Sequence, residues 1–380
     1  MSVAVGSDGL RQQTRRAIYD LVAEQELATK NEIAHALELS LPTVTKYLTH
    51  FLDEGLLQRG AKRPSGVNGG RAPVGYRCVP DGRLAVGVDI TAEGATTLLV
   101  DLQRTVRGVR RAARPFVHAE EYFAFIGAEV TALLRDNDVD PARLLGVGVA
   151  MPGLISRTRQ VVTYGRVLDN RGVSATDFSR HIPYPTRIVH DSDAAGLAEF
   201  WPDQSVQNAF YVSLSRSVGG SVLIGGEVYL GDGEFAGEVG HVELHPEGDQ
   251  CYCGEHGCMD AYCNAGVLSR HTDGVLADFF LGLDRGDPAL GEVWNRYTSD
   301  LARAIVDIRL MFGGTVILGG DVGAYLHQRM EPIWQRVADL HFLTRAPAEF
   351  LMACTNTNEP IATGAALEFV RAFHAELRST

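Results

Sequence analysis

One histidine and three cysteines that lie close together in the sequence offer the clearest chemistry in this chain: His241, Cys251, Cys253 and Cys258. Thiolate sulfur and imidazole nitrogen are ligands that Zn²⁺ prefers, and four of them complete its tetrahedral coordination. Because no position would remain open for water or substrate, we predict a structural zinc site rather than a catalytic one. In a reducing compartment such clustering favours a metal ion over a disulfide.

The assignment of the fourth zinc ligand has alternatives within the same segment. His245 or His256 could replace His241, and Cys263 is a weaker candidate because we expect it on the helix that follows. Buried cysteines that bind no metal commonly behave as small apolar side chains. We interpret the cysteines outside the cluster in this way: Cys78, Cys263 and Cys354.

The elements that must position this cluster alternate between strands and helices. The sequence predicts strands over residues 84–90, 95–102, 144–151, 186–190, 209–215, 221–230 and 315–320. It predicts helices over residues 120–136, 299–311 and 361–377. This alternation indicates an α/β fold with mixed sheets. The strand-rich start recurs at about residue 208, which suggests two related lobes.

The first eighty residues follow a different pattern, with three short helices before two strands. Thr29 is expected to cap the second helix with Glu32 as its capping-box partner, and Ser40 to cap the third, over residues 41–54. Gly55 ends that helix. Short strands over residues 56–59 and 74–79 enclose a segment rich in Gly, Pro and Arg. Three helices followed by a basic hairpin are typical of a winged helix-turn-helix.

The third helix has one polar and one apolar face. Its early polar residues would reach base edges and phosphates in the major groove of DNA: Ser40, Thr43, Thr45, Lys46, Tyr47 and His50. Its apolar residues are expected to face the core: Leu41, Val44, Leu48, Phe51 and Leu52. The hairpin supplies cations for phosphates or the minor groove: Arg59, Lys62, Arg63 and Arg71. The alternative is a small helical domain used for protein contacts.

The distribution of charge is compatible with a nucleic-acid partner although the whole chain carries a net charge of −12. Residues 1–80 hold ten Lys and Arg against eight Asp and Glu, whereas the remainder holds twenty-five against thirty-nine. Binding to phosphates depends on a local basic face and not on the total. The sequence has neither an apolar run long enough to span a membrane nor a secretory signal pattern, so we expect a cytoplasmic protein.

The zinc segment resembles the signature of the ROK family, which comprises repressors, open reading frames and sugar kinases. The resemblance rests on GEVGH and CYCGEHGCMD and extends over nearly the whole chain through six shorter motifs: GVDI, MPG, HDSDAAGLAE, LGDGEFAGEVGH, ILGGDVG and ATGAAL. The winged helix is similar to that of the repressor branch. The resemblance implies a two-lobed actin-like ATPase fold with sugar bound between the lobes. We accordingly expect a DNA-binding domain over residues 1–82, a first lobe over 83–200 completed by 360–380, and a second lobe over 201–359.

Against this family, the phosphate-binding loops are altered. The first loop has the form DxGGT in the kinases but reads Asp89-Ile90-Thr91-Ala92-Glu93 here, so it lacks the glycines and gains a carboxylate. The second loop, GTGxGGG in the kinases, retains only Gly219 and Gly220 and contains Arg216. Backbone N–H groups of glycine-rich turns bind phosphate, so these changes predict the loss of kinase activity.

The residues that the family uses for sugar are partly present. Asp191 matches the catalytic base, here expected to be vestigial, with His190 where an Asn is usual and Asp193 where a second Asn is usual. Alternatively, Asp191 and Asp193 would cap a helix over residues 194–200. Glu238 and His241 match positions that contact sugar, and Asp260 replaces a longer Glu. The predicted ligand-binding residues are therefore His190, Asp191, Glu238, His241 and Asp260.

We therefore expect a transcription regulator, by resemblance a repressor of sugar or carbon metabolism genes. It would bind a double-stranded DNA operator as a homodimer or homotetramer and respond to a sugar or sugar phosphate. One alternative is an active sugar kinase with a DNA-binding appendage. Another is an effector-independent DNA-binding or assembly protein whose ROK domain only dimerises.

Overall fold

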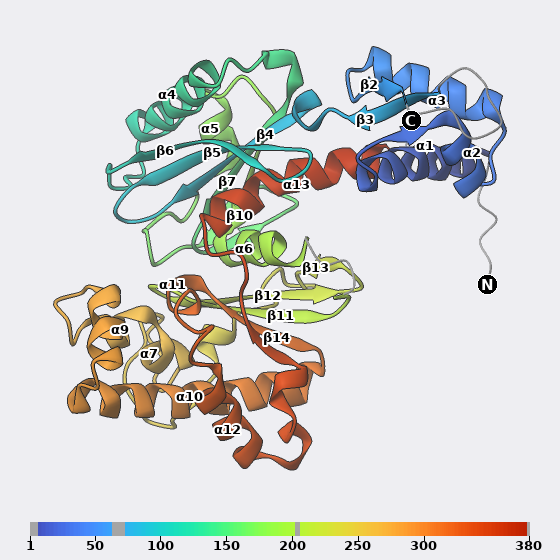
Figure 1. Ribbon diagram of the computed structural model, residues 1–380. Helices are drawn as coiled ribbons and strands as arrows, with labels where there is room; N and C mark the ends of the chain where they lie inside the picture. The colour runs from blue at the N-terminus through green and yellow to red at the C-terminus, as the bar shows by residue number, and fades with distance from the viewer. Residues whose placement is uncertain (1–6, 63–72, 202–205, 378–380) are drawn as a thin grey trace.

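The computed structural model describes residues 7–62, 73–201 and 206–377, which form three larger sheets and one two-stranded sheet, surrounded by helices (Figure 1). A small three-stranded sheet with order β1-β3-β2 belongs to the N-terminal part. Two five-stranded sheets follow, with orders β10-β7-β4-β5-β6 and β13-β12-β11-β14-β15. This arrangement is the predicted one, a winged helix-turn-helix followed by two α/β lobes of the actin-like kind.

The N-terminal part begins with three helices and ends in the hairpin. Its elements are α1 (Ser7–Glu24), β1 (Ala28–Thr29), α2 (Lys30–Ala36), α3 (Leu41–Asp53), β2 (Leu57–Lys62) and β3 (Val74–Cys78). Thr29 and Glu32 form the predicted capping box, and the Ser40 hydroxyl caps α3 at Thr43 N–H. Gly55 adopts φ +70°, a left-handed conformation that ends α3 at low cost because glycine lacks a Cβ.

The apolar face of α3 is buried as predicted except at its first residue. Val44, Leu48 and Phe51 are buried and Leu52 packs against the same core. The prediction that Leu41 faces the core is wrong, because its side chain is 48% exposed at the beginning of the helix. The apolar spacing along α3 includes its first turn, but the core does not extend to that turn, so Leu41 remains exposed.

The first lobe is a sheet covered by α4 (Glu120–Asp136) and α5 (Ala175–Ser179) on one side. Its strands are β4 (Leu84–Ile90), β5 (Ala95–Asp101), β6 (Val106–Ala112), β7 (Leu144–Met151) and β10 (Thr186–His190). β4, β5 and β6 form an antiparallel meander, and β7 and β10 pair parallel to β4. A separate hairpin of β8 (Leu154–Ser156) and β9 (Val161–Tyr164) follows β7.

The second lobe repeats the topology of the first. Its strands are β11 (Ala209–Leu214), β12 (Val218–Ile224), β13 (Glu227–Tyr229), β14 (Thr315–Gly319) and β15 (Leu351–Ala353). Here too three strands form an antiparallel meander and two strands extend the sheet in parallel. Helices cover it: α7 (Met259–Cys263), α8 (Ala265–Ser269), α9 (Leu276–Asp284), α10 (Pro288–Phe312), α11 (Gly320–Gly323) and α12 (Met330–Leu340). The weak recurrence near residue 208 therefore reflects a repeated lobe.

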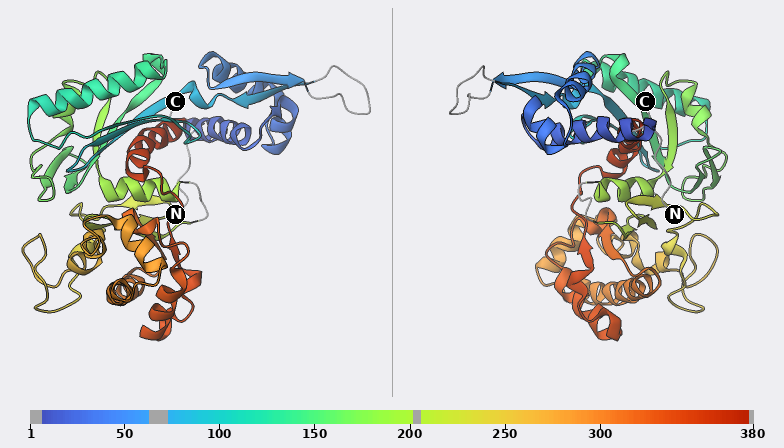
Figure 2. Two further views of the ribbon diagram at one scale, coloured as in Figure 1. Left: turned by 60° about the vertical axis from the view of Figure 1, so that its left-hand side comes forward. Right: turned by 90° about the vertical axis from the view of Figure 1, so that its right-hand side faces the viewer.

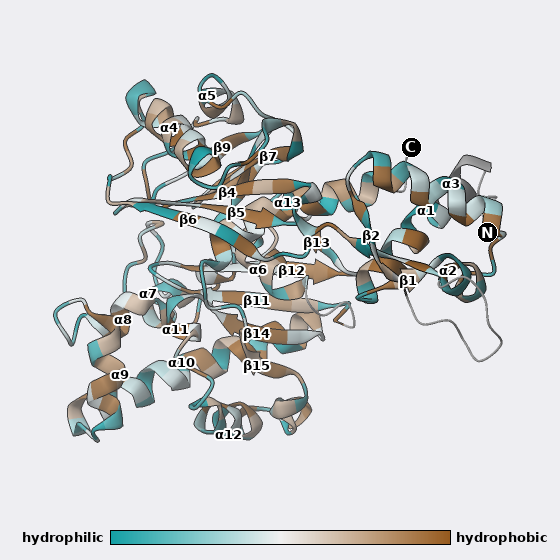
Figure 3. Ribbon diagram, turned by 45° about the horizontal axis from the view of Figure 1, so that its top comes forward, coloured by the Kyte–Doolittle hydropathy of each residue, from teal (hydrophilic) through white to brown (hydrophobic). Residues whose placement is uncertain are grey.

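Some elements differ from the sequence prediction. α10 begins at Pro288, eleven residues before the predicted start, because Asp287 caps it there. β6 was not expected, since its residues alternate between half-buried and exposed and include three arginines. It forms the edge of the first lobe, and Figure 3 shows hydrophilic residues along it where the central strands are mainly hydrophobic. An edge strand needs little apolar surface, so its hydrophobic pattern is weak.

Two helices at the centre join the lobes and the N-terminal part. α6 (Asp191–Phe200) and α13 (Pro360–Glu376) pack against each other, and Gly364 of α13 lies so close to the Ala194 carbonyl that any Cβ there would overlap with it. Gly87 of β4 and Gly148 of β7 similarly make room for carbonyl groups of α13. The small residues of ATGAAL are thus required by close packing of backbones.

The C-terminal half of α13 continues to α1, so that the N-terminal part and the first lobe share one hydrophobic core (Figures 1 and 2). The rings of Tyr19 and His374 lie 5.9 Å apart, and the guanidinium of Arg83 stacks 5.9 Å from the Phe373 ring. The β2–β3 hairpin points away from both lobes (Figure 2). Within the described residues, no helix combines the length and apolar character that crossing a bilayer would require.

Candidate functional site

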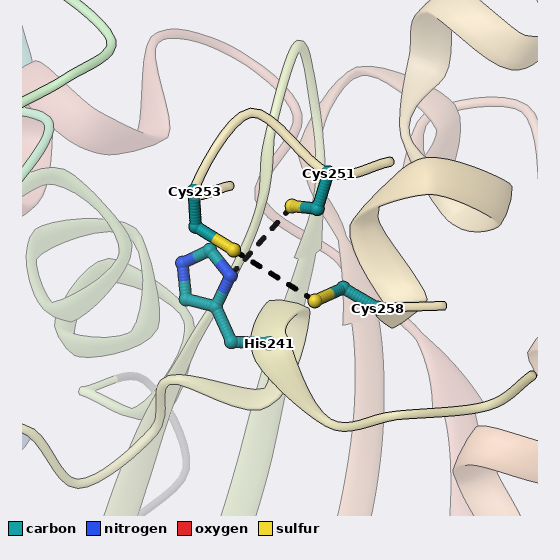
Figure 4. A group of neighbouring side chains, drawn as sticks. All are labelled: His241, Cys251, Cys253 and Cys258. Atoms are coloured by element: carbon teal, nitrogen blue, oxygen red, sulfur yellow. Dashed lines mark hydrogen bonds between the residues drawn. The ribbon is translucent and has the colours of Figure 1, made fainter. Parts of the chain in front are cut away.

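The four predicted zinc ligands come together in the loop that follows β13, as Figure 4 shows. Their ligand atoms all lie within 4.8 Å of one another. His241 is on a short 3₁₀ turn (Val239–His241), Cys251 and Cys253 on the loop, and Cys258 immediately before α7. Gly254 and Gly257, with φ of +105° and +75°, provide the turns that bring the cysteines back to the histidine.

The spacing of these atoms fits a tetrahedral metal ion. The Cys251 Sγ lies 3.8 Å from the His241 Nδ1, and the Cys253 Sγ lies 3.8 Å from the Cys258 Sγ. A tetrahedron with metal–sulfur bonds of about 2.3 Å has edges of about 3.8 Å, so an ion fits between these atoms as they stand. The donor set and the geometry together show a cluster that could hold a metal ion.

The alternative ligands are engaged elsewhere. The His245 Nε2 pairs with Asp300 at 2.8 Å, and its ring packs at 4.4 Å against Tyr262. The His256 Nδ1 lies 3.0 Å from the Gly248 carbonyl oxygen. The three cysteines outside the cluster are buried, as predicted: Cys78, Cys263 and Cys354.

Four of the five predicted ligand-binding residues line one pocket between the lobes: His190, Asp191, Glu238 and His241. They come from the end of β10, the start of α6 and the loop after β13, so both lobes contribute. The pocket lies beside the metal cluster because His241 belongs to both. Its Nδ1 faces the cysteines, and its Nε2 faces the pocket, 3.8 Å from Glu238 Oε2.

Asp260 lies beside the pocket but outside its lining. It is buried, and its Oδ1 accepts a hydrogen bond of 2.6 Å from the Val218 N–H. Burial raises the pKa of this carboxyl, an effect that the Val218 bond partly offsets. The Asp260 carboxylate thus anchors α7 to the start of β12.

The capping interpretation of Asp191 and Asp193 is wrong, because α6 begins at Asp191 and both residues lie in its first turn. Asp191 Oδ1 instead accepts a 2.6 Å bond from the Ser192 N–H and lies 3.2 Å from His190 Nε2. Burial alone would lower the pKa of His190, but three nearby carboxylates raise it above its usual value: Asp191, Asp193 and Glu238. The inner end of the pocket therefore combines carboxylate acceptors with a histidine whose pKa they raise.

Among the pocket residues that were not predicted from the sequence, two connect the pocket to the metal loop. Tyr252, between the first two cysteines, directs its hydroxyl to the His241 Nε2 at 3.2 Å. Arg166, on the loop after β9, donates a 3.2 Å bond to the Tyr252 carbonyl oxygen. The CYC tripeptide could have indicated Tyr252, because a residue between two metal ligands must lie near the ion. Nothing in the sequence indicates that Arg166 reaches the metal loop, since the two segments are far apart in the chain.

A second cleft lies between the lobes, and its lining includes Asp89 of β4 and Ser215, which follows β11. It has a volume of about 480 Å³, and three carboxylates line it: Asp89, Asp321 and Glu359. Burial and the neighbouring carboxylates of Asp191, Glu359 and Asp321 raise the pKa of Asp89 to about 8. Above that pH the cleft gathers negative charge, which opposes the binding of a polyphosphate.

The two altered loops also contact each other. The guanidinium of Arg216, in the turn between β11 and β12, pairs with the Glu93 carboxylate in the turn between β4 and β5. The Arg216 guanidinium, which could otherwise bind an anion, is thus paired with a carboxylate from the opposite lobe.

The recognition helix α3 presents an exposed polar face. Lys46 and His50 are exposed, Thr43 and Thr45 are half-buried, and Tyr47 packs partly against the core. His50 Nε2 lies 3.3 Å from Oε1 of Glu54, which caps the end of the helix, so this contact competes with any phosphate contact. Ser40 is exposed, but its hydroxyl is bound to Thr43 at 2.8 Å.

The hairpin cations are only partly described. Arg59 is exposed on β2, and the backbone of Lys62 ends that strand. The predicted contacts of Arg63 and Arg71, and of the Lys62 side chain, lie outside the described residues.

Comparison with known proteins gives two family matches and several relatives. The winged helix-turn-helix DNA-binding family matches residues 11–58, and the ROK family matches residues 85–367. The chain is 23% identical over 268 residues to the "DNA-binding transcriptional dual regulator NagC" of Escherichia coli (strain K12), covering 69% of this chain and 65% of that protein. The match therefore spans slightly less than two thirds of the NagC regulator.

Kinases and a full-length regulator structure are also similar. An "N-acetylmannosamine kinase" of Escherichia coli O1:K1 / APEC is 32% identical over 146 residues, which cover 37% of this chain and half of the kinase. A crystal structure titled as a ROK family transcriptional regulator, homolog of the E. coli MLC protein, superposes with a TM-score of 0.75 at 19% identity. It covers 97% of this chain and 98% of its own, so the fold extends through both parts. Since the ROK family match runs from β4 into α13, the protein belongs to the ROK family.

Proposed function

We propose that this protein is a DNA-binding transcription regulator whose ROK domain binds a sugar-type effector and has lost kinase activity. One observation carries this proposal: the recognition helix and the pocket between the lobes belong to parts of one molecule that share a hydrophobic core. The relatives named as regulators support it, and by the same similarity we propose repression. The boundaries of the three units are proposed at residues 82/83 and 200/201, with 360–380 completing the first lobe.

The DNA contacts are proposed to follow the helix-turn-helix mode. α3 would lie in the major groove with Thr43, Thr45 and Lys46 towards the bases and phosphates. The exposed Leu41 side chain, at the start of the helix, suits contact with a thymine methyl group. A homodimer or homotetramer would place two such helices on the half-sites of a palindromic operator.

Zinc is the proposed metal at the His241 and cysteine cluster, in a structural role. When bound, it supplies fixed coordination that holds the loop from Gly240 to Asp260 in one conformation. That loop brings His241 and Tyr252 to the pocket, so its rigidity sets the geometry that a ligand meets.

A chain of polar contacts offers a route from the pocket to the DNA-binding part. Glu234, on the same loop as Glu238, accepts a 2.9 Å bond from the Arg157 N–H in the turn between β8 and β9. The Arg157 guanidinium pairs at 2.7 Å with Glu368 of α13, which lies 3.7 Å from Arg371. One turn further on, α13 packs on α1 through His374.

Ligand binding would favour one arrangement of this route over another, and that difference in affinity is the energy available for switching. We expect Glu368→Gln to lower the effect of ligand on operator affinity about five- to tenfold, because the half-buried pair with Arg157 is broken. The measurement is operator affinity by fluorescence anisotropy with and without ligand. Glu331→Gln, at an exposed residue of α12, is the control. Equal ligand effects in both variants would exclude this route.

The function itself is tested by genome-wide mapping of bound DNA sites, followed by binding to the recovered sequences at several salt concentrations. We expect specific, salt-sensitive binding that Lys46→Ala weakens. The failure of the purified protein to bind any recovered site would refute the regulator proposal.

An active sugar kinase is the second candidate, and the retention of Asp191 together with the similarity to N-acetylmannosamine kinases favours it. An ATP-consumption assay with a panel of sugars separates the two, because we expect no turnover above the protein-free control. If the protein regulates transcription without an effector, calorimetry should detect no binding of any sugar in the same panel.

A further inference from the structure

The pocket between the lobes has different charges at its two ends. Asp191 and Glu238, both partly buried, lie at the inner end and provide hydrogen-bond acceptors. Arg166 lies at the exposed mouth. A ligand that fills such a pocket would place its inner end against these acceptors and its outer end beside Arg166. Hydroxyl groups satisfy the carboxylates, since O–H groups donate to them, but hydroxyls leave a guanidinium without a charged partner.

Arg166 is held in place and yet retains most of its donors. One terminal nitrogen, Nη1, donates to the Tyr252 carbonyl oxygen at 3.2 Å, which fixes the side chain against the metal loop. The same nitrogen lies 3.7 Å from the position that a Cβ on Gly254 would occupy, so the guanidinium rests over the turn of that loop. A guanidinium has five N–H donors, and among the described residues a single hydrogen bond from Arg166 is seen. In the described part of the chain, Arg166 forms no ion pair.

The loop that carries Arg166 is itself anchored. Asn170 is fully buried, its amide donates to the Pro152 carbonyl oxygen at 2.9 Å, and its own N–H is bound to the Gly165 carbonyl oxygen at 3.2 Å. These bonds close a turn around Gly165 and Arg166. The guanidinium is therefore presented from a turn fixed at both ends, which lowers the conformational cost of binding a charged group.

We propose that Arg166 selects an effector that bears an anionic group, a phosphate or a carboxylate, beside its hydroxyls. This assignment rests on the proposed sensing function and specifies its ligand. The planar fork of an arginine matches both anions through two parallel hydrogen bonds, whereas it has no comparable match with a hydroxyl. An anion on Arg166 would also pull on Tyr252, because the same guanidinium contacts its carbonyl group. The anionic group would thus connect the first lobe to the metal loop of the second.

The test uses the full-length, zinc-loaded protein and matched sugar pairs in calorimetry: hexoses and N-acetylhexosamines, each with its 6-phosphate, and hexoses with their uronic acids. We expect at least one anionic member to bind about ten- to a hundredfold more tightly than its neutral partner. Arg166→Gln should abolish that preference while changing affinity for the neutral sugar less than about twofold, and Arg166→Lys should retain part of it. Arg171→Gln, at an exposed arginine on the same loop outside the pocket lining, should behave as wild type.

The outcomes separate this assignment from the proposed function. The phosphate and uronate pairs identify which anion is preferred. Binding of neutral sugars alone, or an anion preference that survives Arg166→Gln, overturns the role of Arg166 and leaves sugar sensing in place. If no sugar binds at all, both the sensing function and this assignment fail.

Discussion

The two clefts between the lobes lie side by side but differ in their side chains. The pocket at the metal loop combines acceptors at Asp191 and Glu238 with a histidine and an arginine. The second cleft is lined by carboxylates, and the Arg216–Glu93 ion pair, outside its lining, connects the two lobes. This difference supports the proposed loss of kinase activity in a domain that recognises a polar ligand. In the proposed regulator, binding energy would shift the geometry of the lobes and would not drive a reaction.

The largest expected effect comes from removing a metal ligand, which tests whether the bound metal supports the pocket at the metal loop. Cys258→Ser removes one of four ligands, so we expect metal affinity to fall more than a hundredfold and sugar affinity to fall with it. Zinc content by mass spectrometry and affinity by calorimetry provide the measurements. Cys78→Ala, at a buried cysteine far along the chain from the cluster, serves as the control and should retain zinc.

Normal sugar affinity in a zinc-free Cys258→Ser protein would contradict the dependence of the pocket on the metal. In that case the polar contacts of the loop, such as the Val218–Asp260 bond, would suffice to hold it.

A smaller effect tests the acidity of the other cleft. Folding raises the pKa of Asp89 from 3.8 to about 8, so the folded protein binds the proton more tightly than the unfolded chain. Stability should therefore fall as the pH rises from about 4 to 8, because a charged carboxylate must then be kept beside three others. Asp89→Asn removes this charge. We expect the variant to exceed wild type in unfolding free energy by about 1–3 kcal/mol at pH 8.5, and by less at pH 6.

Urea denaturation at the two pH values measures this difference. An advantage of Asp89→Asn that does not change with pH would show that Asp89 has an ordinary pKa and that the cleft is less acidic than its lining indicates.

The sequence was sufficient for elements whose local signals agree with the fold. The capping box at Thr29, the Ser40 cap and the glycine that ends α3 were predicted, as was the metal cluster, because its ligands lie in one short segment. Contacts between segments that are far apart in the sequence were not predicted. Arg166 meets Tyr252 only because two lobes fold against each other, and Arg216 meets Glu93 for the same reason. Spacing along the chain carries no information about such pairs.

The smallest effect concerns that ion pair, and it separates two explanations of why the second cleft would not accept a nucleotide. Both side chains are more than 60% exposed, so their removal in the double variant Glu93→Ala/Arg216→Ala should change the unfolding free energy by less than about 1 kcal/mol. If the carboxylates of Asp89, Asp321 and Glu359 are what oppose polyphosphate, ATP at millimolar concentration should remain unbound in this variant at pH 8.5, above the Asp89 pKa, as in wild type. Calorimetry with Mg-ATP measures this, with Arg270→Ala, at an arginine of the second lobe outside both clefts, as the control. If ATP bound to the double variant but not to wild type, the ion pair would be what blocks the binding of ATP. The carboxylates would then not be sufficient to exclude it.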